Sequence, residues 1–237
     1  MIIPINKNLV FKNIKPFQIK RDKIIKCNIN NYWREFIKKN NGYFNGDIYV
    51  VSNFNETIDS YTFEIGKTKY ADLIYAKEIS NITCNSLFSS CIFITSDNYY
   101  VLIKNNHDKL NIIGGMADRD DFINNKFSFY HCIKRELKEE LNIDIDDKSI
   151  ILNYCPKYIK IPTLDEAMCP VGVIYVCNLN ITRKDLEKYY NKNIKNFDHE
   201  IKELVFCTKD NYLDFKDMEH KEAYFIELIK LIEKEKK

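Results

Sequence analysis

The sequence contains no apolar run that approaches the roughly 18 residues of a membrane-spanning helix. Its first stretch, MIIPINKNLVFKNIK, is interrupted by Pro4 and by the polar residues Asn6, Lys7 and Asn8. It therefore also lacks the continuous apolar segment of a secretory signal. From these two absences we expect a cytoplasmic protein that does not insert into a membrane.

The eight cysteines include no CxxC pair and no tight cluster with histidine, so the common ligand spacings of a zinc site are missing. In a chain of 237 residues without a secretory signal, we expect no disulfide framework. Most of the cysteines lie in apolar contexts such as SSCIFI and IYVCNL, where a free cysteine behaves as a small hydrophobic residue. The dispersed histidines match no nucleophile or ligand spacing and receive no role: His107, His131, His199 and His220.

The charges of the chain form no basic stripe. Thirty-six Lys and Arg residues and 34 Asp and Glu residues are interspersed and leave a net charge of +2. Extended nucleic-acid binding through phosphates is therefore not expected. The apolar fraction of 45% and the charged fraction of 30% are typical of a soluble globular protein. Nothing in the sequence indicates an oligomeric state.

The chain divides by its patterns into an N-terminal β-rich extension, residues 1–84, and a main domain, residues 85–237. Within the extension, aromatic and apolar residues at helical spacing predict a short amphipathic helix over about 29–40. Strand formers follow around 48–54 and again around 63–65, while the segment KYADLIYAKEI is compatible with helix or extended structure.

The main domain mixes strands and helices in an order that predicts an α/β sandwich. A hairpin is expected from SLFSSCIFIT and NYYVLIKNN, joined through a polar turn. A helix from about Ser128 to Asn142 carries one apolar stripe, and asparagine suits a left-handed helix cap. The other expected elements are strands at 150–155, 171–181 and 200–208 and helices at 182–194 and about 217–235.

The segment RELKEELNI, residues 135–143, gathers three carboxylates on one helix face. Glu136, Glu139 and Glu140 stand at spacings of three and four residues, which are neighbouring positions on a helix. Clustered carboxylates suit Mg²⁺ or Mn²⁺. The alternative is a solvated face on which nearby Arg and Lys side chains screen the glutamates.

The preceding loop favours the metal site. Gly114 and Gly115 close an apolar strand, and Asp121 lies six positions after Gly115. Together with residues 135–143, this pattern resembles the signature of the Nudix hydrolases: a Gly, five residues, a Glu, seven residues, and then REUxEExGU with U apolar. The chain departs from it in three places. Asp121 stands at the first Glu, six extra residues precede Arg135, and Asn142 replaces the last Gly.

The resemblance implies a Nudix-type α/β/α sandwich with a mixed sheet, preceded by the small β-rich region. It implies that Glu136, Glu139 and Glu140 are the main ligands of Mg²⁺ or Mn²⁺, with Asp121 as a further ligand. An aspartate carboxylate there falls about 1.5 Å short of a glutamate's. Arg135 is implied to pair with a carboxylate of the cluster and to fix its rotamer.

The resemblance also implies a general base outside the signature. Our candidates are Glu200 and Glu203 in HEIKELVF, because the family commonly carries an ExxE-like stretch before its last strand. Asp165 and Glu166 in the loop IPTLDEAMCP are the alternatives. Taken alone, each of the four fits an ordinary surface carboxylate better than a general base.

The regions outside the signature are similar to the UDP-glucose and UDP-galactose hydrolysing Nudix subfamily, through NYWREFIKKNNGYFNGDIYVVSNF, EIGKTKYADLIY and VGVIYVCNLNITRKDLEKYY. This implies hydrolysis of a nucleoside diphosphate linked to another moiety, with a UDP-sugar giving UMP and sugar 1-phosphate. An mRNA-decapping or ADP-ribose-type Nudix hydrolase is the alternative, as is a non-catalytic nucleotide-binding module that retains metal without turnover. Candidates for contact with the base are Tyr32, Trp33, Phe44, Tyr49, Lys69 and Tyr70.

Overall fold

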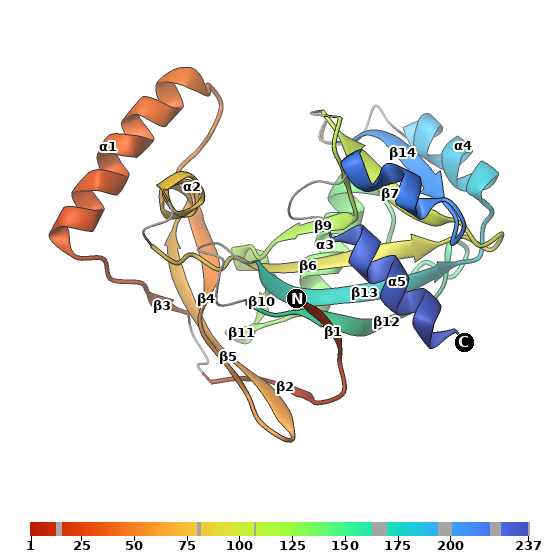
Figure 1. Cartoon of the computed structure of the whole chain (residues 1–237), viewed down its shortest axis with the longest axis horizontal. Helices are drawn as coiled ribbons and strands as arrows, with labels where there is room; N and C mark the ends of the chain where they lie inside the picture. The colour runs from red at the N-terminus through yellow and green to blue at the C-terminus, as the bar shows by residue number, and fades with distance from the viewer. Residues whose placement is uncertain are drawn as a thin grey trace.

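A computed structural model describes residues 1–12, 16–79, 82–106, 108–162, 170–193, 201–218 and 224–236. Its centre is an eight-stranded mixed sheet in the order β1-β12-β13-β6-β7-β14, with β8 paired to β7 and β9 paired to β6 (Figure 1). The strands are β1 (Ile2–Pro4), β6 (Leu87–Ile94), β7 (Tyr100–Asn105), β8 (Leu110–Asn111), β9 (Ile113–Met116), β12 (Ile151–Lys160), β13 (Val171–Leu179) and β14 (Ile201–Cys207).

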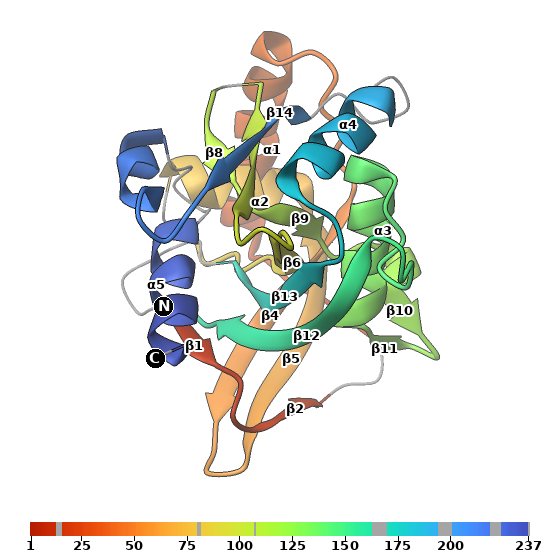
Figure 2. The same ribbon diagram turned by 90° about the vertical axis from the view of Figure 1, so that its right-hand side faces the viewer.

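Helices cover both faces of this sheet because its central strands are apolar on both sides. All eight residues of β6 are buried. On one face lie α3 (Phe129–Leu141) and α4 (Arg183–Asn193), and on the other lies α5 (Phe225–Glu235), as Figure 2 shows. Each face has its own apolar cluster, and these three helices contribute to them. The expected α/β/α sandwich with a mixed sheet is therefore confirmed.

The N-terminal part forms a second, four-stranded sheet with two helices. Its long hairpin consists of β4 (Asp47–Glu56) and β5 (Ser60–Lys69), and two short strands run parallel to β5. The remaining elements are β2 (Asn8–Phe11), β3 (Phe17–Gln18), α1 (Lys23–Lys39) and α2 (Tyr70–Ile79). The segment left open between helix and extended structure is thus helical. β1 pairs with β12 of the main sheet, and the boundary at residue 84 stays a prediction.

The extra residues of the signature loop form a hairpin that covers the junction between the two sheets. Its strands are β10 (Phe122–Ile123) and β11 (Lys126–Phe127). Asn124 and Asn125 between them both have positive φ, 50° and 63°, which fits a tight hairpin turn. Phe122 packs on Tyr49 of β4 with a ring-centroid distance of 4.4 Å. The insertion thereby joins the N-terminal sheet to the start of α3.

Two expected helix boundaries are wrong. α1 begins at Lys23 and not near residue 29, because the side chain of Asp22 accepts a hydrogen bond from the backbone N–H of Ile25 at 2.9 Å and caps the helix earlier. The last helix begins at Phe225 and not near 217, since residues 212–218 form a 3-10 helix. The strands β1 to β3 were not expected, since two to four residues carry too little alternation to read.

Of the helices in the described parts of the chain, none is both long and apolar enough to cross a bilayer. Both ends of the chain lie beside the main sheet (Figures 1 and 2). The backbone N–H of Ile2 donates to Glu227 of α5 at 3.2 Å.

Candidate functional site

The glutamate helix α3 is defined at both ends by its own side chains. Ser128 accepts a hydrogen bond from the backbone N–H of His131 at 3.2 Å, an N-cap. Asn142 adopts the left-handed conformation, φ 54°, and its N–H reaches the carbonyls of the last turn. The apolar stripe of the helix faces the sheet: Phe129, Cys132, Ile133, Leu137 and Leu141 are buried. This orientation turns the glutamates toward the loop that follows β9.

The three glutamates border one cavity of about 410 Å³. Its other walls come from β9 and the following loop, Gly114 to Asp118, and from the start of β4, Asp47 and Ile48. Glu139 is the most accessible of the three, with a side chain 48% exposed. Glu136 and Glu140 are largely buried. Helix, glycine turn and N-terminal sheet thus meet around one group of carboxylates.

The glycine pair has a steric reason at both positions. A Cβ on Gly115 would meet the carboxylate of Glu136, so any other residue there would have to displace the end of that side chain. Gly114 has φ +140°, and a Cβ there would stand 2.4 Å from the carbonyl oxygen of Ser89 on the neighbouring strand. The backbone N–H of Gly114 donates to Glu140 at 3.3 Å. The pair lets the strand pass close beneath the glutamates.

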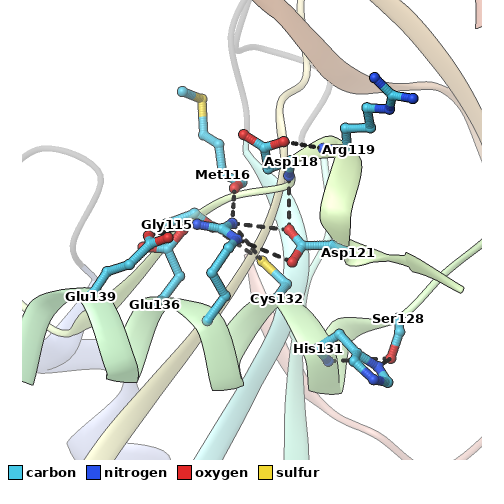
Figure 3. A network of polar contacts seen from close by, with 11 residues as sticks. Gly115, Met116, Asp118, Arg119, Asp121, Ser128, His131, Cys132, Glu136 and Glu139 are labelled. Atoms are coloured by element: carbon cyan, nitrogen blue, oxygen red, sulfur yellow. Dashed lines mark hydrogen bonds and ion pairs between the residues drawn. The ribbon is translucent and has the colours of Figure 1, made fainter. Parts of the chain in front are cut away.

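Arg135 connects the carboxylates of the helix to that of the loop residue Asp121. Figure 3 shows Asp121 on one side of this polar network and Glu136 and Glu139 on the other. Its guanidinium contacts Asp121 through two nitrogens at 2.9 and 3.2 Å. It reaches Glu136 at 2.8 Å and Glu139 at 2.9 Å, and it donates to the carbonyl of Met116 at 3.0 Å. A planar guanidinium suits such fork-like pairing. One side chain therefore contacts three of the four implied metal ligands.

Asp121 lies beneath this network and is only 1% exposed. Besides Arg135, its carboxylate accepts a hydrogen bond from the backbone N–H of Asp118 at 2.8 Å, part of a reciprocal capping box. Both oxygens thus have protein partners. Asp121 as a metal ligand stays a prediction, and its contacts in the structure are those of a residue that holds Arg135.

Burial raises the pKa of Glu136 to about 7, with the neighbouring Glu139 adding to the rise and Arg135 opposing it. Near neutral pH this carboxyl is therefore poised between its two protonation states. A charge this poorly solvated gains more from a cation than an exposed carboxylate does. The electrostatics of the cavity favour a positively charged ligand.

The donor set fits a hard divalent cation. Carboxylate oxygens on three adjacent positions line the cavity, and Mg²⁺ or Mn²⁺ prefers such ligands. Across the described ranges, no three acidic, histidine or cysteine side chains already surround one point. Mg²⁺ commonly takes only one or two carboxylates and completes its shell with water and substrate phosphate. Glu136, Glu139 and Glu140 are the residues that would hold it.

Replacing Glu136 by glutamine is expected to stabilise the metal-free protein at pH 8. The folded pKa of about 7 lies above the ordinary 4.5, so this group's stabilising contribution is complete below pH 4.5 and is lost as the pH rises through 7. Glutamine keeps the shape without the charge, so the free energy of unfolding should rise by about 1–3 kcal/mol at pH 8. The gain should vanish near pH 4.5.

Urea unfolding in EDTA at several pH values measures this effect. Glu139→Gln is the matched control, because Glu139 is half exposed and should respond less. Equal or lower stability of Glu136→Gln at pH 8 would show that burial is not what sets this pKa.

A second cavity, of about 240 Å³, adjoins the first, and both share Gly114, Gly115 and Met116. Ser90 lines it and is 4% exposed, and its hydroxyl has no hydrogen-bond partner within the described structure. The other lining residues combine aromatic, polar and apolar side chains: Tyr70, Leu73, Ile74, Lys77, Ser86, Phe88, Asn111, Ile112, Pro170 and Tyr224. We did not anticipate Ser90 from the sequence. Two serines inside the apolar strand LFSSCIFI were the available signal.

The candidates for the general base differ in where they lie. Glu203 lies on β14 and pairs with Lys104 of β7 at 2.9 Å, and it is not among the residues of either cavity. Glu200, and the alternatives Asp165 and Glu166, lie outside the described residues. The identity of a general base therefore stays a prediction.

The residues proposed to contact the nucleotide base lie in different parts of the structure. Tyr70 lines the second cavity. Tyr49 is buried against Phe122, and Tyr32 packs on Tyr75 of α2. Lys69 pairs with Asp47 at the edge of the carboxylate cavity, at 2.7 Å. Of the remaining two, Trp33 contacts Tyr70 and Phe44 is 83% exposed.

No family model and no curated protein sequence matches this chain. Among solved structures, the chain resembles DR0079 from Deinococcus radiodurans at 14% identity and a TM-score of 0.50, with 78% of this chain and 97% of that one covered. A MutT protein from Methanosarcina mazei Go1 is 13% identical with 66% and 98% covered and a TM-score of 0.42. A Nudix hydrolase from Nitrosomonas europaea is 12% identical with 58% and 81% covered and a TM-score of 0.37. At these identities the likeness concerns the fold alone. Of the three structures named here, DR0079 is similar enough to support that fold.

Proposed function

We propose that this chain is a Nudix-type, Mg²⁺- or Mn²⁺-dependent hydrolase of a nucleoside diphosphate linked to another moiety. The observation that carries the proposal is the cavity bordered by Glu136, Glu139 and Glu140 beside the glycine turn. Oxygen ligands at the end of a cavity with room for a phosphate group are what metal-assisted phosphoryl chemistry requires. The resemblance of residues 114–143 to the Nudix signature supports the same reaction.

The protein's own residues have separate tasks in this proposal. The three glutamates would hold the cation, which when bound would neutralise the diphosphate charge and lower the pKa of the attacking water. Arg135 orients Glu136 and Glu139 from its anchor on Asp121. The backbone from Gly114 to Met116 borders both cavities, so a diphosphate lying along it has its organic part in the second cavity.

We propose a UDP-sugar as the substrate, giving UMP and sugar 1-phosphate. The similarity of the N-terminal stretches to the UDP-sugar subfamily supports this choice. The second cavity, of about 240 Å³, supports it in chemistry, because its wall combines aromatic, apolar and polar side chains. Tyr70 at its wall provides a surface for stacking.

A second candidate is a diphosphate linked to RNA, as in an mRNA cap. A specific observation favours it: the first 39 residues carry ten Lys and Arg residues but only two acidic ones. A long polyanionic substrate benefits from such a region, whereas a UDP-sugar does not need it.

Product analysis by mass spectrometry tests the proposal. The full chain is incubated with Mg²⁺ and a panel: UDP-glucose, UDP-galactose, ADP-ribose, dinucleoside polyphosphates, nucleoside triphosphates and capped RNA. UMP with sugar phosphate supports the UDP-sugar assignment. Turnover of another member keeps the chemistry and replaces the substrate. No turnover, together with an unfolding temperature raised by Mg²⁺, would overturn the hydrolase and favour a non-catalytic nucleotide-binding module.

A further inference from the structure

The near-neutral charge of the chain hides a strong separation. Residues 1–39 have a net charge of +8, from ten basic and two acidic residues, so the rest of the chain carries −6. Most of the basic residues belong to α1 and the segment before it. Figure 1 shows α1 at the far end of the molecule from the main sheet, so its outer side is open. The net charge of the whole chain does not reveal this basic region.

Three of these ten basic residues line a groove of about 550 Å³ between α1 and the N-terminal sheet. Lys20 and Lys26 line it, are exposed, and form no ion pair within the described residues. Arg21 and Lys69 also line it, and both are paired, Arg21 with Asp72 at 2.9 Å. Four basic residues and one acidic residue, Asp72, thus line the groove. Two of the four, Lys20 and Lys26, have no ion-pair partner among the described residues.

The remaining lining is uncharged and partly amide. Asn30 and Asn45 contribute side chains that can donate and accept hydrogen bonds. Phe44, adjacent to Asn45 in the chain, is 83% exposed, and Tyr43 is 50% exposed. Exposed rings beside a positively charged groove are the elements with which proteins hold unpaired bases.

A membrane surface is the alternative partner of a basic amphipathic helix, and the packing of α1 argues against it. Ile29 is buried in the cluster with α2, and Tyr32 and Trp33 contact Tyr75 and Tyr70. The middle of the apolar side of the helix is therefore already occupied by the protein. Only Ile24 and Ile37, near its two ends, are large apolar residues of α1 that stay exposed, which is too little apolar surface for a lipid interface. A concave groove also suits a strand better than a flat bilayer.

We infer that α1 and this groove bind single-stranded nucleic acid. Lys20 and Lys26 contact successive phosphates, the charge of α1 extends the track, and Phe44 stacks on a base. Lys69, which lines the groove, pairs with Asp47, which lines the carboxylate cavity, so the two sites adjoin. The binding of the strand does not depend on the proposed function. A further step, in which the bound strand presents its terminal diphosphate to the glutamates, rests on that function.

Fluorescence anisotropy with a labelled single-stranded RNA and the full chain tests the inference. EDTA is present, so that binding is measured without metal-dependent turnover. The variant is Lys20→Glu with Lys26→Glu, and the matched control reverses the same number of charges on α4, Lys184→Glu with Lys192→Glu. Affinity is measured at several salt concentrations, and circular dichroism confirms that every variant is folded.

The groove variant should bind about tenfold more weakly than the wild type at moderate salt, with a salt slope lower by about one for each lost phosphate contact. The α4 control should bind like the wild type. Equal affinity of both double variants, or no salt-dependent binding by the wild type, would overturn the inference. So would binding to phosphatidylserine vesicles without binding to RNA. Because hydrolysis of the substrate panel is measured separately, failure of one proposal leaves the other standing.

Discussion

Glu139→Gln should lose hydrolysis almost completely while folding normally. The carboxylate lies in the cavity beside the glycine turn, and its removal takes a ligand away from the proposed cation. Removing even an indirect partner of a metal ligand costs about 10–100-fold, so loss of a direct ligand should cost more than about a hundredfold in turnover. Since the side chain is 48% exposed, the substitution should hardly change stability.

The rate is measured on whichever panel member the wild type hydrolyses, and Mg²⁺-dependent unfolding is measured beside it. Glu187→Gln on α4 is the matched control, because it removes one carboxylate from a helix that borders neither cavity. Glu140→Gln should resemble Glu139→Gln in rate. Rates close to wild type in both variants would remove the metal role of this helix.

Arg135→Leu should destabilise the protein strongly, independently of any catalysis. Asp121 is 1% exposed and would lose its guanidinium partner, and Glu136 would lose its nearest cation at 2.8 Å. Breaking a buried pair by removing one member costs about 3–5 kcal/mol, because the other charge stays buried without compensation. For a domain of this size, that lowers the unfolding temperature by about 10 °C.

Chemical unfolding in EDTA measures the effect apart from metal binding. Lys188→Ala is the matched control, since its pair with Asp185 is exposed and should contribute less than about 1 kcal/mol. The double substitution Arg135→Leu with Asp121→Asn should recover part of the loss, because asparagine removes the stranded charge. A loss no larger than that of Lys188→Ala would mean that the network does not hold the loop.

Local patterns predicted the elements whose signals are repeated over several turns or residues. The four-residue steps from Phe129 to Leu141 indicated α3, and Ser128 and Asn142 supplied its caps. The long strands β6 and β13 followed from continuous apolar runs. Boundaries failed where a single side chain decides them, as Asp22 does for α1.

The candidate site could be predicted from the sequence in part. The spacing of Glu136, Glu139 and Glu140 placed them on one face, and the structure brings them to one cavity. It also places Arg135 on Asp121, a pairing across 14 residues that depends on how the inserted hairpin folds back. The second cavity could not be predicted from the sequence, because Ser90, Asn111 and Tyr224 come from distant segments.

By itself, the sequence determined the α/β class and the glutamate helix with its caps, because each depends on the backbone and side chains of adjacent residues. Only the tertiary structure decided that the inserted hairpin joins the two sheets, that Arg135 shares its charge among three carboxylates, and that Lys20, Arg21 and Lys26 line one groove with the distant Lys69. These features depend on which surfaces bury one another, and that choice is made by packing across the whole chain, not by any local pattern.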